Sequence, residues 1–147
     1  MTSFVFDDRN IVWSKLADLE HFVYSILGID QNQRVIDLLI KFDAHQQIVL
    51  HRHKVHNNMF VIQGEHRLYE ADGTIKEIRP VGRFTSSPPQ EEPHREGGGD
   101  QDAIVLFSIH AGDEILYEVL DDNLKVATTL SFQDFVGLYS AQQGKAS

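Results

Sequence analysis

Apolar and polar positions alternate with a period of two along several short segments of the chain, as is typical of half-buried β-strands. These segments are rich in Val, Ile, Phe and Tyr, and turn residues separate them. The pattern predicts strands over 11–16, 21–28, 34–42, 47–52, 58–63, 66–71, 75–79, 82–86, 103–109 and 114–120. Many short strands at close spacing predict an all-β sandwich or barrel, with its core between about residues 11 and 120.

One helix is predicted, at 131–142. Ser131-Phe132-Gln133-Asp134 fits a capping box, and the apolar residues that follow recur at helical spacing and share one face. That face is expected to cover a barrel end or an edge of the core. No internal repeat or linker is evident, so residues 1–147 are expected to form a single domain. The longest irregular stretch is the polar segment 88–102.

Charge and composition narrow the function. The formal net charge of −9 argues against nucleic acid and anionic membranes as partners. The chain has no cysteine, which excludes disulfides, thiolate ligands and cysteine nucleophiles. No signal peptide is visible and the apolar runs are too short to cross a bilayer, so we expect a cytoplasmic location and no membrane contact.

The eight histidines are the unusual feature of the composition. His51 and His53 are two residues apart in a predicted strand, so both imidazoles face the same side and can meet one ion. Alone, this pattern also fits two surface histidines. His94 lies in the irregular segment, where a third metal ligand would anchor the loop. We therefore predict that one divalent metal is bound by His51, His53 and His94.

These residues resemble the two motifs of the cupin family. His51-Arg52-His53 is followed after three residues by Asn57 and after six more by Gly64, and Gly82 leads through Pro88 to His94. The resemblance implies a single-domain cupin (jelly-roll) β-barrel with a short C-terminal helix. The sequence departs from the family at two positions: His45 replaces an expected glycine, and Asn57 replaces the glutamate that usually binds the metal.

Without that glutamate, three neutral imidazoles would leave the charge of the metal uncompensated, which favours an anionic chelating substrate such as an enolate. The three-histidine cupins that the sequence resembles are β-diketone dioxygenases, including the acetylacetone-cleaving enzyme, and 2,4′-dihydroxyacetophenone dioxygenase. The resemblance implies Fe(II), with Zn(II) as an alternative. It also implies cleavage of a carbon–carbon bond of a small diketone or hydroxy-ketone by dioxygen.

Period-two reasoning extends the predicted pocket around the metal. Tyr69 and Arg67 are expected to face inward, and Glu91 could orient His94, so these three are the catalytic candidates; for Glu91, a solvated loop position is the alternative. His56 is either a surrogate ligand or a turn residue, and His66 is expected on the outer face of its hairpin. The substrate-binding candidates, which could equally be barrel core, are Met59, Val61, Val105, Phe107 and Ile109.

Two other functions fit the same sequence. Three-histidine cupins also form zinc-binding regulatory domains of anti-sigma factors, although this chain lacks the additional helical segment and the cysteines that such proteins usually carry. A metal-dependent isomerase or hydrolase is the third possibility, because three histidines can hold a zinc-bound hydroxide. The outward apolar residues Phe60 and Ile62 suggest a homodimer.

Overall fold

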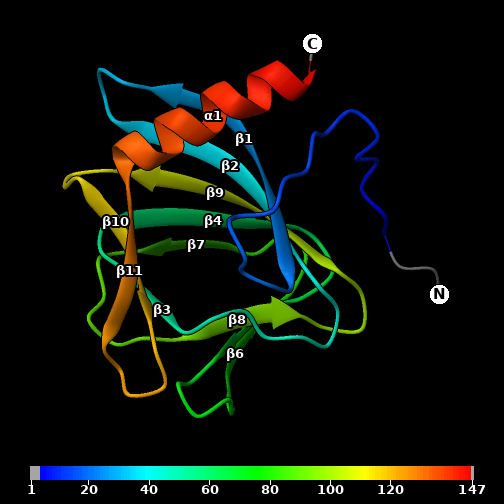
Figure 1. The fold of residues 1–147 in the computed structure, drawn as a ribbon. Coiled ribbons are helices and arrows are strands. Elements are labelled where there is room, and N and C mark those ends of the chain that lie inside the picture. Colours follow the sequence, from blue (N-terminus) through cyan, green and yellow to red (C-terminus); the bar gives the residue numbers. More distant parts are fainter. Residues whose placement is uncertain (1–3, 147) are drawn as a thin grey trace.

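A computed structural model describes residues 4–146 of the chain. This part consists of β-strands and one helix (Figure 1). The elements are β1 (Phe22–Asp30), β2 (Val35–Phe42), β3 (His51–His53), β4 (His56–Gln63), β5 (His66–Tyr69), β6 (Ile75–Arg79), β7 (Phe84–Ser87), β8 (Arg95–Gly98), β9 (Ala103–His110), β10 (Ile115–Leu120), β11 (Val126–Ser131) and α1 (Phe132–Ala146).

The strands form a two-layered, antiparallel barrel, as the cupin resemblance implies. A five-stranded sheet has the order β1-β2-β9-β4-β7, and two three-stranded sheets have the orders β11-β10-β3 and β6-β5-β8. Isolated bridges between Ala44 and Gly98 and between His51 and His94 bring β8 close to the segment that contains β3. The all-β prediction is confirmed.

Side chains that alternate along the strands fill the space between the layers. Ile36, Leu38 and Phe42 on β2 and Phe107 and Ile109 on β9 are all buried. Because β2 and β9 are central strands of the large sheet, their apolar faces form its inner surface. Part of this inner surface, Leu38 and Phe107, lies beside the candidate site described below.

The predicted helix is confirmed and continues to Ala146. The Asp134 amide donates to Ser131 Oγ at 3.0 Å and the Ser131 amide to Asp134 Oδ2 at 2.8 Å, which is the reciprocal bonding of a capping box. Phe132 and Phe135 are buried against the core. The helix therefore covers one end of the barrel, at the top of Figure 1.

The strand predicted over 11–16 is wrong, and two strands were missed. In 11–16 the pairing is a single bridge between Ser14 and Tyr24. The missed β11 carries mostly exposed side chains, so hydrophobic periodicity does not reveal it. The missed β8 runs into Gly97–Gly98–Gly99, which resembles a loop in sequence. In the structure a Cβ on Gly97 would clash with the Gln46 carbonyl oxygen, and one on Gly98 would lie 3.0 Å from the Asp43 carbonyl oxygen, so close backbone approach explains these two glycines.

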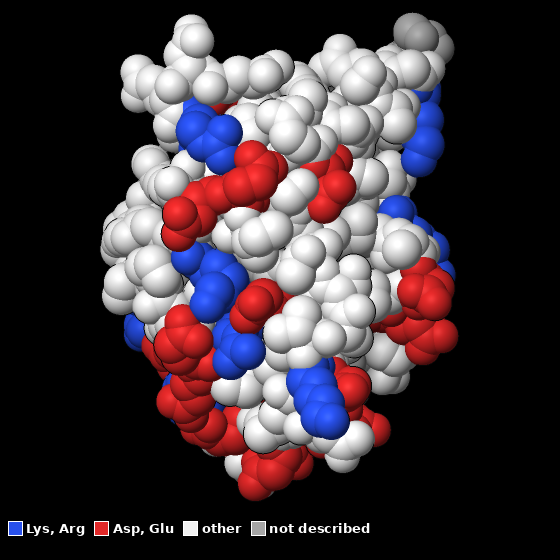
Figure 2. Space-filling view, turned by 60° about the vertical axis from the view of Figure 1, so that its left-hand side comes forward, with Lys and Arg blue, Asp and Glu red and all other residues white. Residues whose placement is uncertain are grey.

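On the outer face of the large sheet, Phe60 and Phe84 are cross-strand partners and are 41% and 60% exposed. The homodimer expected from this face stays a prediction. Figure 2 shows one side of the molecule, where Lys and Arg side chains are interspersed with Asp and Glu. In the described part of the chain, no helix has the length and apolar character needed to cross a membrane.

Candidate metal centre

His51 and His53 lie on the same buried face of the short strand β3, with exposed fractions of 6% and 4%. β3 pairs with β10, where Tyr117 lies opposite His53. His94 is held beside His51 by two backbone hydrogen bonds of 3.0 and 2.9 Å. This bridge brings the distant segment to the strand, so the three histidines predicted from the sequence come together.

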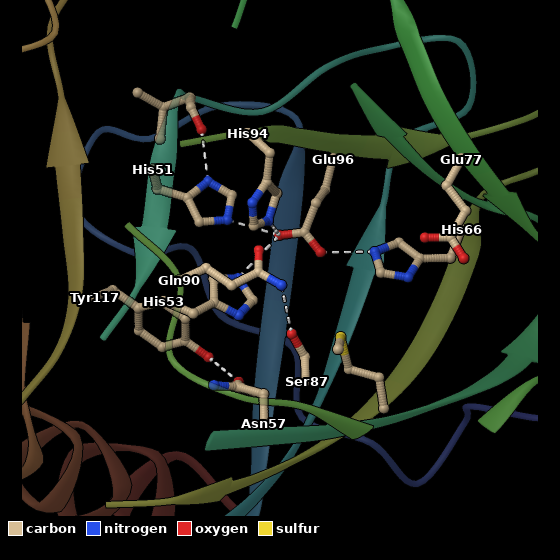
Figure 3. A network of polar contacts seen from close by, with 12 residues as sticks. His51, His53, Asn57, His66, Glu77, Ser87, Gln90, His94, Glu96 and Tyr117 are labelled. Atoms are coloured by element: carbon tan, nitrogen blue, oxygen red, sulfur yellow. Dashed lines mark hydrogen bonds and ion pairs between the residues drawn. The ribbon is translucent and has the colours of Figure 1, made fainter. Parts of the chain in front are cut away.

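A fourth group, Glu96, lies at the centre of this cluster. It follows His94 by two residues along β8. Its Oε2 atom is 2.7 Å from His51 Nε2, 3.7 Å from His53 Nε2 and 3.6 Å from His94 Nε2 (Figure 3). Glu96 is 2% exposed. One ligand atom from each of these four residues lies within 4.8 Å of the others.

The donor atoms fit one divalent metal ion. His53 Nε2 and His94 Nε2 are buried and have no hydrogen-bond partner among the described residues. Such atoms are costly to bury unless they have a partner, which a bound cation supplies. The His51 Nδ1–H donates to the Val49 carbonyl oxygen at 2.8 Å and so directs Nε2 toward Glu96. Three imidazoles and a carboxylate suit Fe(II) and Zn(II) alike.

The expectation of an all-histidine site is therefore wrong, because a carboxylate is present at a different position. Asn57 does face inward and is fully buried. Its Oδ1 accepts a hydrogen bond of 2.8 Å from the Tyr117 hydroxyl, and its Nδ2 donates to the Val55 carbonyl oxygen at 3.0 Å. Asn57 thus orients Tyr117, and Glu96 supplies the negative charge.

Replacing Asn57 by Asp is expected to destabilise the protein by about 2–4 kcal/mol. A carboxylate here would lose the donor to Val55 and face that carbonyl oxygen in a fully buried place. Urea unfolding measures the change. Asn58→Asp, on the opposite face of β4, is the matched control. An Asn57→Asp protein as stable as Asn58→Asp would contradict this role.

His66 contacts Glu96 from within the barrel, although the sequence predicted His66 on the outer face of its hairpin. His66 is fully buried, and its Nε2 lies 2.7 Å from Glu96 Oε1. Its ring stacks on Phe42 with centroids 5.1 Å apart. Oε1 of Glu96 is thus hydrogen-bonded to His66, and Oε2 remains directed at the three histidines of the cluster.

The three catalytic candidates lie outside the cluster. Arg67 points away from it and forms an ion pair of 3.0 Å with Glu65, because the faces of β5 are the reverse of those expected. Tyr69 is buried beside Gly97 rather than in the site. The Glu91 side chain is 83% exposed and pairs with Lys54 at 2.9 Å. None of these three residues is in a position to contact a metal held by the cluster.

His56 is not a surrogate ligand. Its Nε2 lies 2.8 Å from Ser86 Oγ, on the outer face of the large sheet. His110 lies directly opposite it on β9 and is exposed.

A cavity of about 60 Å³ adjoins the cluster. Of the five predicted substrate-binding residues, Phe107 lines it. Met59, Val61, Val105 and Ile109 are buried in the core and do not, so for these four the core interpretation holds. The lining consists of Leu16, Leu19, Phe22, Tyr24, Leu38, Ile40, Ile48, Val49, His51, His53, Glu96, Phe107, Tyr117, Leu130 and Phe135.

Burial and the nearby carboxylate of Glu96 determine the pKa values of the histidines. It lowers the pKa of His53 to about 4 and also lowers the pKa of His94. Burial opposes charge on His51 too, but the hydrogen bond to Glu96 and the charge of Glu96 outweigh it and raise the His51 pKa. Burial likewise opposes the charge of Glu96, yet the hydrogen bonds from His51 and His66 and the proximity of His53 and His94 hold the pKa of Glu96 well below its usual range.

At pH 6, binding of one divalent metal is expected to release about one proton. The raised pKa of His51 means that this imidazole is mostly protonated at pH 6, whereas His53, with a pKa of about 4, is already neutral. Titration calorimetry with Zn(II) in buffers of different ionisation enthalpy gives the number of protons. Release of three protons would contradict the lowered pKa values of His53 and His94.

Sequence comparison finds no match among protein-family models or among curated proteins. Solved structures do match in fold. An RmlC-like cupin protein from Ralstonia eutropha has a TM-score of 0.74 and 15% identity, covering 100% of this chain and 90% of its own. A putative acetylacetone dioxygenase from Methylibium petroleiphilum has a TM-score of 0.71 and 10% identity, covering 95% and 96%. An acetylacetone dioxygenase from Acinetobacter johnsonii has a TM-score of 0.68 and 13% identity, covering 97% and 93%.

Sequence identity this low supports a shared fold and gives no information on the reaction. With its antiparallel barrel and these structural neighbours, the chain has the cupin fold.

Proposed function

We propose that this protein is an Fe(II)-dependent dioxygenase that cleaves a carbon–carbon bond of a small β-diketone or hydroxy-ketone. The observation that carries the proposal is the convergence of His51, His53, His94 and Glu96, since three of these residues, all except His94, also line an apolar cavity. The fold is shared with an acetylacetone dioxygenase and with a putative one, which makes this reaction class a candidate for the same barrel.

Charge balance selects the form of the substrate. The carboxylate of Glu96 offsets one of the two positive charges of the metal, and the imidazoles of His53 and His94 are neutral. A net charge in an apolar cavity is costly, so a ligand with one negative charge is favoured. A β-diketone bound as its enolate supplies that single charge and two oxygen atoms for chelation.

The side chains of the cavity orient such a ligand. Tyr117 stands edge-on to His53, with ring centroids 5.0 Å apart, and its hydroxyl is held by Asn57. Phe107 and Phe135 add apolar walls that exclude water. Fe(II), when bound, would supply a Lewis acid for the enolate and a redox-active centre through which electrons of the substrate reach dioxygen.

Oxygen uptake tests the proposal. Protein loaded with Fe(II) under anaerobic conditions receives a panel of β-diketones and hydroxy-ketones, and oxygen consumption is followed. For a β-diketone, we expect one molecule of dioxygen to be consumed per substrate. One oxygen atom enters each product, a carboxylic acid and a 1,2-dicarbonyl compound. The Zn(II)-loaded protein is the control and should consume none. The absence of uptake across the panel by the Fe(II)-saturated protein would refute the proposed reaction.

A further inference from the structure

The cavity beside the cluster has a closed inner end and an open mouth. His51, His53 and Glu96 mark the inner end and are buried. The partly exposed lining residues mark the opening, and these are Leu16, Leu19, Ile40, Val49 and Leu130. We call these five aliphatic side chains the rim. A ligand whose polar end reaches the cluster therefore directs its substituents toward the rim.

Part of this rim is a turn in the segment before β1. The backbones of Ser14 and Tyr24 exchange two hydrogen bonds of 2.9 Å, and the Leu19 amide donates to the Leu16 carbonyl oxygen at 3.1 Å. Lys145 Nζ on α1 donates to Ser14 Oγ at 3.1 Å. Ala17, inside the turn, has a φ of 51°, a left-handed conformation that costs energy in a residue other than glycine. Hydrogen bonds to β1 and to α1 thus hold this turn in place.

The size of the cavity limits what fits behind this rim. A water-sized group needs about 10–15 Å³ of such volume. The cavity of about 60 Å³ therefore holds only a few groups of that size. A longer substituent has to pass between Leu16, Leu19 and Leu130.

We propose that Leu16, Leu19 and Leu130 determine specificity, restricting the site to ligands with a metal-chelating polar end and a short apolar substituent. For the reaction proposed above, on which this inference rests, the substrates are diketones with short alkyl groups. The aliphatic rim offers no charged or hydrogen-bonding side chain to a substituent, so the selection is by size.

The test uses ligand binding without turnover. Anaerobic Co(II)-loaded protein is titrated with 1-alkylimidazoles from methyl to pentyl, and binding is read from the visible spectrum of the metal. The wild-type protein should bind the pentyl compound more weakly than the methyl compound. Leu19→Ala and Leu130→Ala should each strengthen pentyl binding at least about fivefold, with methyl binding changed less than about twofold. Leu124→Ala, an exposed leucine at the β10–β11 turn, is the control and should change neither.

The outcomes separate this inference from the proposed reaction. The inference is overturned if the wild-type protein binds the methyl and pentyl compounds with equal affinity, or if it binds neither. It is also overturned if neither Leu19→Ala nor Leu130→Ala changes the ratio of the two affinities. A parallel titration with pentane-2,4-dione and octane-2,4-dione addresses the substrate. If the alkylimidazoles follow the expected pattern and neither diketone binds, the role of the rim is supported and the proposed reaction is contradicted.

Discussion

Replacing Glu96 by Gln is expected to lower the affinity for a divalent metal by at least about 100-fold. The substitution keeps the size of the side chain but removes the charge that lies 2.7 Å from His51 Nε2. It also puts a neutral amide between three imidazoles that have no other anionic partner in the cluster. Competition with a chelating dye measures the affinity for Zn(II) and Fe(II).

Glu91→Gln is the matched control for this substitution. Glu91 is also a glutamate near His94 in sequence, but it is exposed and pairs with Lys54. Its replacement should leave the metal affinity within about twofold of the wild type. Equal affinities in Glu96→Gln and Glu91→Gln would mean that the three histidines alone hold the metal.

The metal-free protein is expected to lose stability as the pH falls from 6.5 to 4. The unfolded chain protonates His53 near its ordinary pKa of 6.5, whereas the folded protein resists this until about pH 4. Unfolding therefore takes up a proton in this window, and stability present above pH 6.5 is lost as the pH falls. A difference of this size corresponds to roughly 3 kcal/mol from His53, and the lowered pKa of His94 acts in the same direction.

Urea unfolding in the presence of a chelator, at several pH values from 4 to 7, measures this loss. His53→Gln should reduce the pH dependence, because one of the titrating groups is gone and the contribution of His94 remains. His110→Gln, on the exposed outer face, should retain it. A His53→Gln protein with the pH dependence of the wild type would show that another group is responsible.

The alternation of residues was sufficient to predict an all-β fold and the histidine pair on β3, but not the inner face of β5. In β5, each face combines one polar and one apolar residue, His66 with Leu68 and Arg67 with Tyr69. Alternation therefore gives no preference there, and a shift of one residue reverses both faces. The reversal brings His66 into the site and leaves Arg67 outside.

Glu96 shows a different limit of sequence reasoning. Its spacing from His94 is the same two residues that relate His51 to His53, so recognition of β8 as a strand would have revealed it. The run of glycines after it suggested a loop. Gly97 and Gly98 reflect the close approach of the chain near Gln46 and Asp43, a tertiary contact that no local pattern contains.

The hydrogen bond between Lys145 and Ser14 links the helix that covers the barrel to the turn at the cavity mouth. Nearby, Gln142 bonds both the amide and the carbonyl group of Ile26 at 2.8 Å. A purification tag or a deletion that disturbs this last helical turn therefore affects the mouth of the cavity, although it is remote from the histidine cluster in sequence. Preparations that differ only at that end of the chain should be compared for ligand preference before their activities are equated.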